Sequence, residues 1–146
     1  MFSKEEAARL RKDFWTSYGK SFPRKWLLYN TKIKGFSFKF YADNKIARVQ
    51  LDIEPLSEEK RVLLFEQVNA LKTVLTNEYL PEAIFEKDYY LENGKCISRV
   101  FVQLDCKFSI YNKNTWGDAF QFYNHSMEQF EYWFYEYEEF IKQALE

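Results

Sequence analysis

The C-terminal stretch carries the pattern that most restricts the fold of this chain. Apolar side chains recur there at steps that alternate between four and three residues. The stripe consists of Trp116, Phe120, Tyr123, Met127, Phe130, Phe134, Tyr137 and Ile141. This spacing places all of them on one face of an α-helix of about thirty residues, roughly 45 Å long. The rest of the chain must therefore supply an apolar surface along this helix.

Such a helix is longer than the diameter of a compact domain of 146 residues, roughly 38 Å. The helix must either kink or extend beyond the domain. Its end carries Tyr135, Tyr137 and Phe140, and we expect these side chains to pack against another surface. The simplest such surface is a second copy of the chain. A monomer at high concentration in light scattering would contradict this expectation.

A first hairpin is predicted over residues 36–53. Phenylalanines occupy alternate positions over 36–40, and the return strand alternates in the same way. A two-residue turn at Asp43-Asn44 places every apolar residue on one face of the hairpin. The same register sets Lys39 directly opposite Arg48 on the outer face. Like charges at opposed positions destabilise a sheet by up to about 1 kcal/mol. We therefore expect a negatively charged group to lie near this pair.

A second hairpin is centred on Asn93-Gly94, a strong turn signal. Its predicted register places Glu82 opposite Asp105, and Lys107 follows two residues later. Acids and a lysine in this arrangement resemble a site in which a nuclease holds Mg²⁺. Short matches of this kind are common in a chain with 29% charged residues, so a small metal-dependent nuclease is the weakest functional alternative.

The order of elements predicts the fold class. A helix capped by Ser3 precedes the first hairpin, and a second helix between Ser57 and Pro81 separates the hairpins. The order is α-β-β-α-β-β-α, with three helices, the last of them long. We expect one α+β domain over residues 1–146, with an antiparallel sheet of about four strands and helices on one face. The WLLY segment at 26–29 fits either a short strand or a helical turn.

Charge is divided unequally along the chain. Residues 1–45 carry eleven Lys and Arg against four Asp and Glu, a net of +7, and residues 46–146 carry ten against eighteen, a net of −8. We name as candidate binding residues the cations of the first hairpin and those expected near it: Lys32, Lys34, Lys39, Arg48 and Arg99. Their face fits an anionic ligand or nucleic acid. The interpretation that we favour for this face is neutralisation by acids, such as those from Glu128 onward, within the chain or from a partner copy, and an unused exposed face is the remaining alternative.

The sequence contains no catalytic signature. His125 is the only histidine, and Cys96 and Cys106 lie at opposite ends of one predicted strand, too far apart to bridge. Neither cysteine has metal-ligand spacing, so we assign no catalytic residue, cofactor or metal site. The longest apolar runs are a few residues, which excludes a membrane span, and the start lacks the apolar stretch of a signal peptide. We expect a cytoplasmic protein with reduced thiols.

Several long phrases of the chain resemble a known family. They are FWTSYGKSFPRKWLLYNTKIKGFSFKFYADN, DYYLENGKCISRVFVQLD and SIYNKNTW. Together they are similar to an uncharacterised bacterial family known only as a domain of unknown function. Its members occur alone or as the C-terminal module of larger proteins, some of them predicted to be nuclease-like. The resemblance implies a module that works beside other proteins, in systems related to nucleic acids, and it supplies no catalytic residues.

Three functional hypotheses follow. The first is a non-catalytic protein-interaction module that associates with itself or with another protein. The second is a nucleic-acid-binding accessory module that uses the basic sheet face. The third is the metal-dependent nuclease, so the sequence leaves the question of enzymatic activity open while favouring a non-enzyme.

Overall fold

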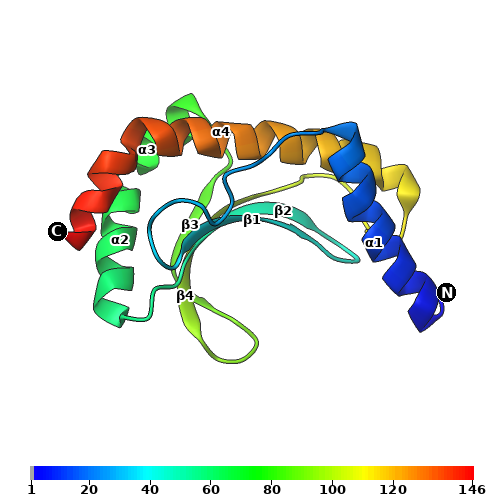
Figure 1. Cartoon of the computed structure of the whole chain (residues 1–146), viewed down its shortest axis with the longest axis horizontal. Coiled ribbons are helices and arrows are strands. Elements are labelled where there is room, and N and C mark those ends of the chain that lie inside the picture. The colour runs from blue at the N-terminus through cyan, green and yellow to red at the C-terminus, as the bar shows by residue number, and fades with distance from the viewer. Residues whose placement is uncertain (1) are drawn as a thin grey trace.

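A computed structural model describes residues 2–146 of the chain, which has an α+β architecture (Figure 1). In chain order its elements are α1 (Lys4–Ser21), β1 (Phe36–Ala42), β2 (Ala47–Ile53), α2 (Glu58–Ala70), α3 (Lys72–Glu78), β3 (Ile84–Tyr90), β4 (Cys96–Gln103) and α4 (Trp116–Lys142). Single 3₁₀ turns precede and follow α4. The predicted class and order are confirmed. The second predicted helix is two helices, because the Leu71 N–H donates to the Val68 carbonyl and tightens the chain into a turn between them.

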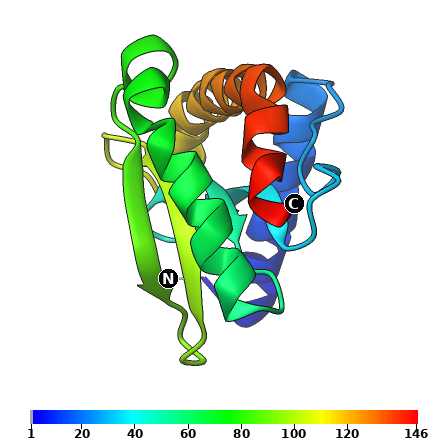
Figure 2. The same ribbon diagram turned by 90° about the vertical axis from the view of Figure 1, so that its left-hand side faces the viewer.

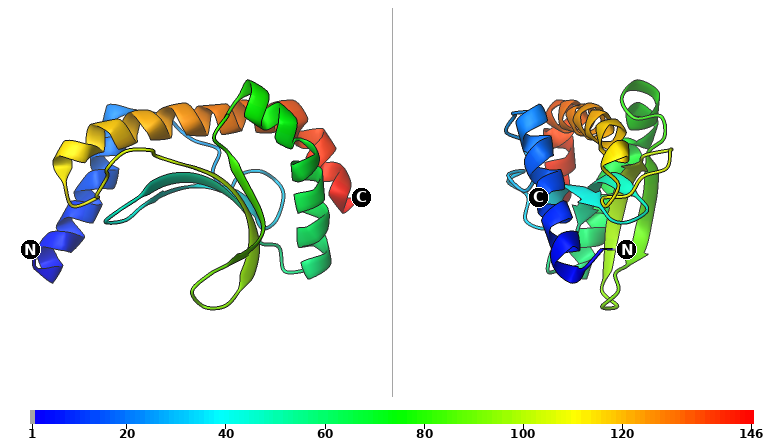
Figure 3. Two further views of the ribbon diagram at one scale, coloured as in Figure 1. Left: turned by 180° about the vertical axis from the view of Figure 1, so that it is seen from behind. Right: turned by 90° about the vertical axis from the view of Figure 1, so that its right-hand side faces the viewer.

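The four strands form one antiparallel sheet in the order β1-β2-β4-β3, so β1 and β3 are its edges. The sheet curls, and α4 runs along its convex face while α1 and α2 descend at its two ends (Figures 1 and 3). The inward side chains of the strands meet the stripe of α4 in one aromatic core. Its fully buried members include Phe14, Phe36, Phe38, Val49, Leu51, Val100, Tyr123, Phe130, Trp133 and Phe134.

The first hairpin forms with its apolar residues on the predicted face, but its register differs by two residues from the prediction. Lys39 lies opposite Gln50, and Arg48 lies opposite Tyr41. The turn is centred one residue later, because the Asp43 carboxylate accepts hydrogen bonds from the N–H groups of Lys45 and Ile46. A shift of two preserves the faces of both strands. The predicted opposition of Lys39 and Arg48 is therefore wrong.

The second hairpin is also shifted, and it contains an irregularity between Glu86 and Tyr89. Arg61 of α2 explains where the strand departs from regular pairing. It is 4% exposed, and its Nη1 donates to the Lys87 carbonyl at 2.5 Å and to the Ser98 hydroxyl at 2.8 Å. This side chain fastens α2 to the irregular part of β3.

The end of α4 folds back onto the domain. In Figure 2 its last turns lie beside α2, and the Gln67 side chain of α2 donates to the Phe140 carbonyl at 2.6 Å. Tyr137 and Phe140 are half-buried and pack against the core, whereas Tyr135 is 55% exposed. Of the two expected alternatives, the helix bends rather than extending beyond the domain, and two of its three terminal aromatic residues pack against the core.

The segment between α1 and β1 is neither a strand nor a helix at the undecided positions 26–29. Leu28 has a φ of 50° and lies in a turn closed by a hydrogen bond from the Asn30 N–H to the Leu27 carbonyl. The segment ends at Gly35, whose φ is 73° and where a Cβ would collide with the Pro55 backbone. Within residues 2–146, no helix combines the length and the apolar character needed to cross a bilayer.

Candidate binding sites

Two hollows in the surface are candidate binding sites, one polar and one apolar. The polar hollow lies on the outer face of the sheet and has a volume of about 580 Å³. Its lining includes Lys39, Arg48, Gln50, Tyr89 and Arg99. Three of the five predicted cations therefore meet in one pocket. Lys32 and Lys34 do not line it, and both are exposed on the segment before β1.

Acids of β2 and its end neutralise two of these three cations. Asp52 is 2% exposed and accepts hydrogen bonds from Arg99 Nε at 2.7 Å and from Arg99 Nη2 at 3.1 Å. Lys39 Nζ lies 3.3 Å from Asp52 and 3.1 Å from Glu54. Burial by itself would lower the pKa of Lys39, but the attraction of Asp52 and Glu54 raises it. The acids come from the neighbouring positions of the sheet, and those after Glu128 do not reach this face.

Arg48 is the cation of this pocket that forms no ion pair with a carboxylate within residues 2–146. Its guanidinium lies over the rings of Phe101 at 4.4 Å and Tyr41 at 5.9 Å. One nitrogen donates to the Gln103 amide at 3.0 Å, and another makes a long bond of 3.4 Å to the Tyr89 hydroxyl. Arg48 is therefore held by rings and neutral groups, and its charge faces the pocket.

Asp43 at the pocket's edge makes the stability of the hairpin depend on pH. Burial by itself would raise the pKa of Asp43, but hydrogen bonds from the backbone of Ile46 and Lys45 outweigh it and lower the pKa below the ordinary 3.8. A lowered pKa in the folded state stabilises the protein above the unfolded value, and this contribution is lost as the pH falls through the folded value.

We therefore expect Asp43→Asn to be less stable than the wild type at pH 6 by about 1 kcal/mol, with the difference narrowing below about pH 4. Urea unfolding of both proteins at pH 6 and pH 3 measures it. The other acids titrate in both proteins, so their contribution cancels. A difference that stays constant with pH would show that the Asp43 charge contributes nothing.

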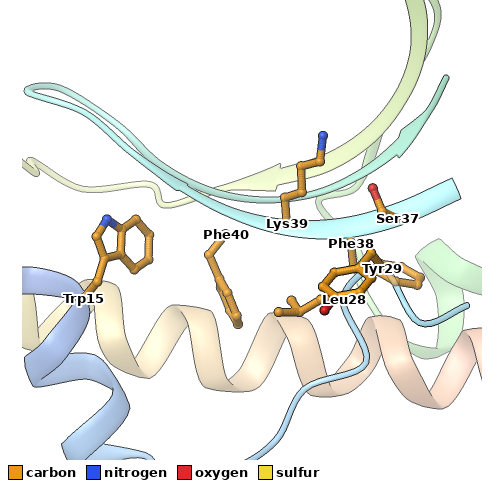
Figure 4. A pocket seen from close by; sticks show the side chains of 7 residues that line it. All are labelled: Trp15, Leu28, Tyr29, Ser37, Phe38, Lys39 and Phe40. Atoms are coloured by element: carbon orange, nitrogen blue, oxygen red, sulfur yellow. The ribbon is translucent and has the colours of Figure 1, made fainter. Parts of the chain in front are cut away.

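The apolar hollow is a groove of about 430 Å³ between α1, β1 and the turn at 27–30 (Figure 4). Trp15 closes one end, Leu28 and Tyr29 close the other, and Phe38 and Phe40 of β1 point into it. Lys39 extends to the opposite side of the strand (Figure 4). Two rim residues are strongly solvent-accessible for aromatic side chains, Trp15 at 37% and Tyr29 at 75%. The groove is thus an open apolar surface beside a sheet edge.

One residue of β1, Phe40, has backbone hydrogen-bonding groups on the groove side that remain without a backbone partner in residues 2–146. Bonds from the Asp43 N–H to the Ile46 carbonyl and from the Glu54 N–H to the Gly35 carbonyl mark the paired positions of the hairpin. Because such positions alternate, the even-numbered residues of β1 direct their N–H and C=O groups to the free edge. The Phe38 N–H donates to the Leu28 carbonyl at 3.0 Å. Within the described chain, the N–H and C=O groups of Phe40 have no backbone partner.

A buried carboxylate of α4 fixes the turn that borders the groove. Glu131 is 3% exposed, and it accepts hydrogen bonds from the Leu27 N–H at 2.6 Å and from Arg24 at 2.9 Å. Arg24 also reaches Glu128 at 2.8 Å and lies over the Trp26 ring at 4.1 Å. The position of this turn, and so the width of the groove, depends on Glu131.

The residues of the nuclease alternative are not brought together by the sheet. Glu82 precedes β3 and Asp105 follows β4, and the observed register does not pair them. Across residues 2–146, no group of three or more His, Cys, Asp and Glu side chains could hold a metal ion. His125 is exposed on α4.

The groove was missed at the level of sequence because its walls come from three separate segments. The one local signal was a β1 strand predicted next to a segment of unassigned structure, which left one edge of the strand without a neighbour. Glu131 was missed because a sequence does not distinguish an acid on the exposed face of a helix from one that accepts a hydrogen bond from the backbone of a distant residue.

A family model described as Domain of unknown function (DUF4268) matches residues 10–138 of the 146-residue chain. No curated protein and no solved structure matches the chain.

Proposed function

Because the chain belongs to the family described as Domain of unknown function (DUF4268), we propose its function from its own structure. It is a non-catalytic protein-interaction module that binds an extended segment of a partner protein along the free edge of β1. The observation that carries this proposal is the coincidence of an apolar groove with unpaired backbone groups of Phe40.

Both features are needed for recognition of an extended peptide. Such a peptide adds a strand to a sheet edge through backbone hydrogen bonds, and a pocket for alternate side chains gives specificity. The N–H and C=O groups of Phe40 supply the bonds, while the space between Trp15 and Tyr29 accepts an apolar side chain. An exposed sheet edge is otherwise a liability that natural proteins cover or charge. The preceding segment covers this edge at Phe36 and Phe38, whose N–H groups donate to the carbonyls of Ile33 and Leu28, and it leaves the edge open at Phe40. Lys39 also lines the groove, but its side chain extends to the other face of the sheet.

Charge indicates the chemistry of the partner. Residues 20–41, which include the turn and β1, contain six Lys and Arg and no acid. Only two of these six, Arg24 and Lys39, form ion pairs within the described residues. Lys32 and Lys34 remain exposed beside the start of β1. We therefore assign the groove to a segment with an apolar residue flanked by acids.

The same charge argues against a second copy of the chain as the occupant. Edge-to-edge pairing of two β1 strands would bring two basic segments together, and like charges at an interface oppose association. The aromatic residues proposed for self-association also offer less surface than expected, since Tyr137 and Phe140 are half-buried against the core. A different protein is the better occupant.

The nucleic-acid alternative has weaker support. A phosphate-binding face needs several unneutralised cations. On the outer sheet face Lys39 and Arg99 are already paired with Asp52 and Glu54, which leaves Arg48.

An NMR titration with designed peptides tests the proposal. The peptides are eight residues long, with one or two apolar residues in alternate positions and acids at both ends. Binding is expected to shift the Phe40 amide and slow its hydrogen exchange, because it gains a hydrogen bond. The Phe38 amide, already bonded to Leu28, should change less.

Tyr29→Glu provides the matched variant. It places a negative charge at the rim of the groove, and we expect at least a tenfold loss of peptide affinity by apolar loss and repulsion. Tyr132→Glu is the control, because Tyr132 is 50% exposed on α4 and does not line the groove. Equal affinities of the two variants, or binding that leaves the Phe40 amide unchanged, would refute the proposal.

A further inference from the structure

The polar pocket contains two buried hydrogen-bonding atoms that the protein leaves unpaired. They are Gln50 Oε1, an acceptor, and Arg48 Nε, a donor. The Gln50 residue is 6% exposed, and its Nε2 donates to Asp52 at 3.1 Å, which fixes the orientation of the amide. The two residues are two positions apart on β2, so their side chains share the outer face.

Two buried polar atoms without hydrogen-bond partners lower the stability of the folded protein. Each buried polar atom without a partner opposes folding, and the great majority of such atoms in proteins are paired. A leucine at position 50 would remove the unpaired acceptor and lose the hydrogen bond to the Asp52 carboxylate. A donor and an acceptor on successive outward positions of β2, both in residues that line the pocket, match a ligand that offers an acceptor and a donor on one edge.

The walls of the pocket are flat. Arg99 lies over the Tyr89 ring at 4.1 Å, and Arg48 lies over the Phe101 ring at 4.4 Å. Tyr90, which is 69% exposed, adds a ring to the lining. Guanidinium planes and tyrosine rings are the surfaces on which nucleic-acid bases stack.

We propose that this pocket binds a single heteroaromatic molecule of the nucleobase class, such as a nucleoside. An N–H of the base donates to Gln50 Oε1, and an adjacent carbonyl or ring nitrogen accepts from Arg48 Nε. Glutamine and arginine side chains are common hydrogen-bonding partners of base edges. The volume of about 580 Å³ accommodates a base and its sugar.

Access to the two atoms requires a small rearrangement. Both are covered in the unliganded pocket, and the Arg48 guanidinium is held on one side by a 3.4 Å bond to the Tyr89 hydroxyl. A bond of that length is weak. A change of the Tyr89 χ1 rotamer breaks this bond and frees Arg48 Nη1, so that the guanidinium can turn its Nε toward the ligand.

Neutralisation of Lys39 and Arg99 decides between a base and a polyanion. Asp52 and Glu54 already form ion pairs with these cations, so the pocket has little electrostatic attraction for a chain of phosphates. The ligand is recognised by stacking on its ring and by hydrogen bonds to the edge of its base. This inference does not depend on the peptide groove, which lies on the other side of β1.

Titration of the whole chain with adenosine, guanosine, cytidine and uridine, followed by amide NMR, tests the inference. We expect saturable shifts at Gln50, Tyr89 and Arg99 with at least one nucleoside below about 10 mM. Gln50→Leu should weaken that nucleoside at least tenfold. Gln121→Leu, the same change at an exposed position of α4, should leave its affinity unchanged, as should Tyr29→Glu in the groove.

Three results would overturn the inference. The first is the absence of shifts at these residues with all four nucleosides. The second is equal affinity of Gln50→Leu and the wild type. The third is binding only of oligonucleotides, with an affinity that falls steeply with salt and is unchanged by Gln50→Leu, which would indicate phosphate contacts.

Discussion

Asp52→Asn is expected to destabilise the protein by about 3–5 kcal/mol, because it leaves a buried cation without its partner. Arg99 is 7% exposed, and its two hydrogen bonds to a carboxylate both end on Asp52. An asparagine offers one neutral acceptor and turns an N–H₂ group toward the guanidinium. Urea unfolding at pH 7 measures the loss.

Glu54→Gln is the matched control. Glu54 also pairs with Lys39, and with Lys95 at 3.5 Å, but all three side chains are accessible to solvent. Such pairs contribute within about 1 kcal/mol. The double variant Asp52→Leu with Arg99→Leu removes both charges and should be more stable than Asp52→Asn, since no unpaired charge remains. A cost below about 1 kcal/mol for Asp52→Asn would mean that Arg99 reaches water by another route.

The same substitution tests whether the Asp52 carboxylate prevents the outer face of the sheet from binding nucleic acid. Without Asp52, the outer face presents Arg48, Arg99 and a less constrained Lys39 together. We expect Asp52→Asn to gain affinity for single-stranded DNA at low salt, and to lose it again as salt rises. Binding by the wild type as strong as that of the variant would favour the nucleic-acid hypothesis instead.

The parts of the fold that follow from periodicity were predictable. The stripe from Trp116 to Ile141 gives α4, and the alternation over residues 36–53 gives the correct faces of β1 and β2. Both signals depend only on which side of an element a residue lies. A register error of two residues leaves each side chain on the same face of the sheet. The predicted pattern of burial was therefore correct although the predicted partner of Lys39 was wrong.

The predictions that were wrong depend on single side chains whose contacts the local sequence pattern does not reveal. The Asp43 carboxylate moved the first turn by one position, and Arg61 holds the irregular part of β3. Asp52 neutralises Arg99 because β2 lies next to β4, a neighbour relation that neither hairpin pattern contains. Of the candidate cations, Lys39, Arg48 and Arg99 lie together on the outer face of the sheet, whereas Lys32 and Lys34 do not, and the partners of Lys39 and Arg99 follow from the tertiary structure.

Glu131→Leu is expected to cost about 2–4 kcal/mol and to weaken peptide binding at the groove at least tenfold. The substitution leaves the Leu27 N–H without its acceptor and releases Arg24 from α4. The turn at 27–30 then moves, and the hydrogen bond from the Phe38 N–H to the Leu28 carbonyl weakens. Leu28 and Tyr29 no longer close the groove at a fixed width, so a peptide must pay the cost of ordering them.

Hydrogen exchange separates this local effect from a general loss of stability. In Glu131→Leu the Phe38 amide should exchange faster than global unfolding allows, while amides of β2 and β4 exchange at the global rate. Glu128→Gln is the control, because Glu128 pairs with the same arginine but accepts no hydrogen bond from a backbone N–H of residues 2–146, and its side chain is 32% exposed. If the Phe38 amide in Glu131→Leu stays as protected as its neighbours in β2, the turn does not depend on Glu131. Any loss of peptide affinity would then have another origin.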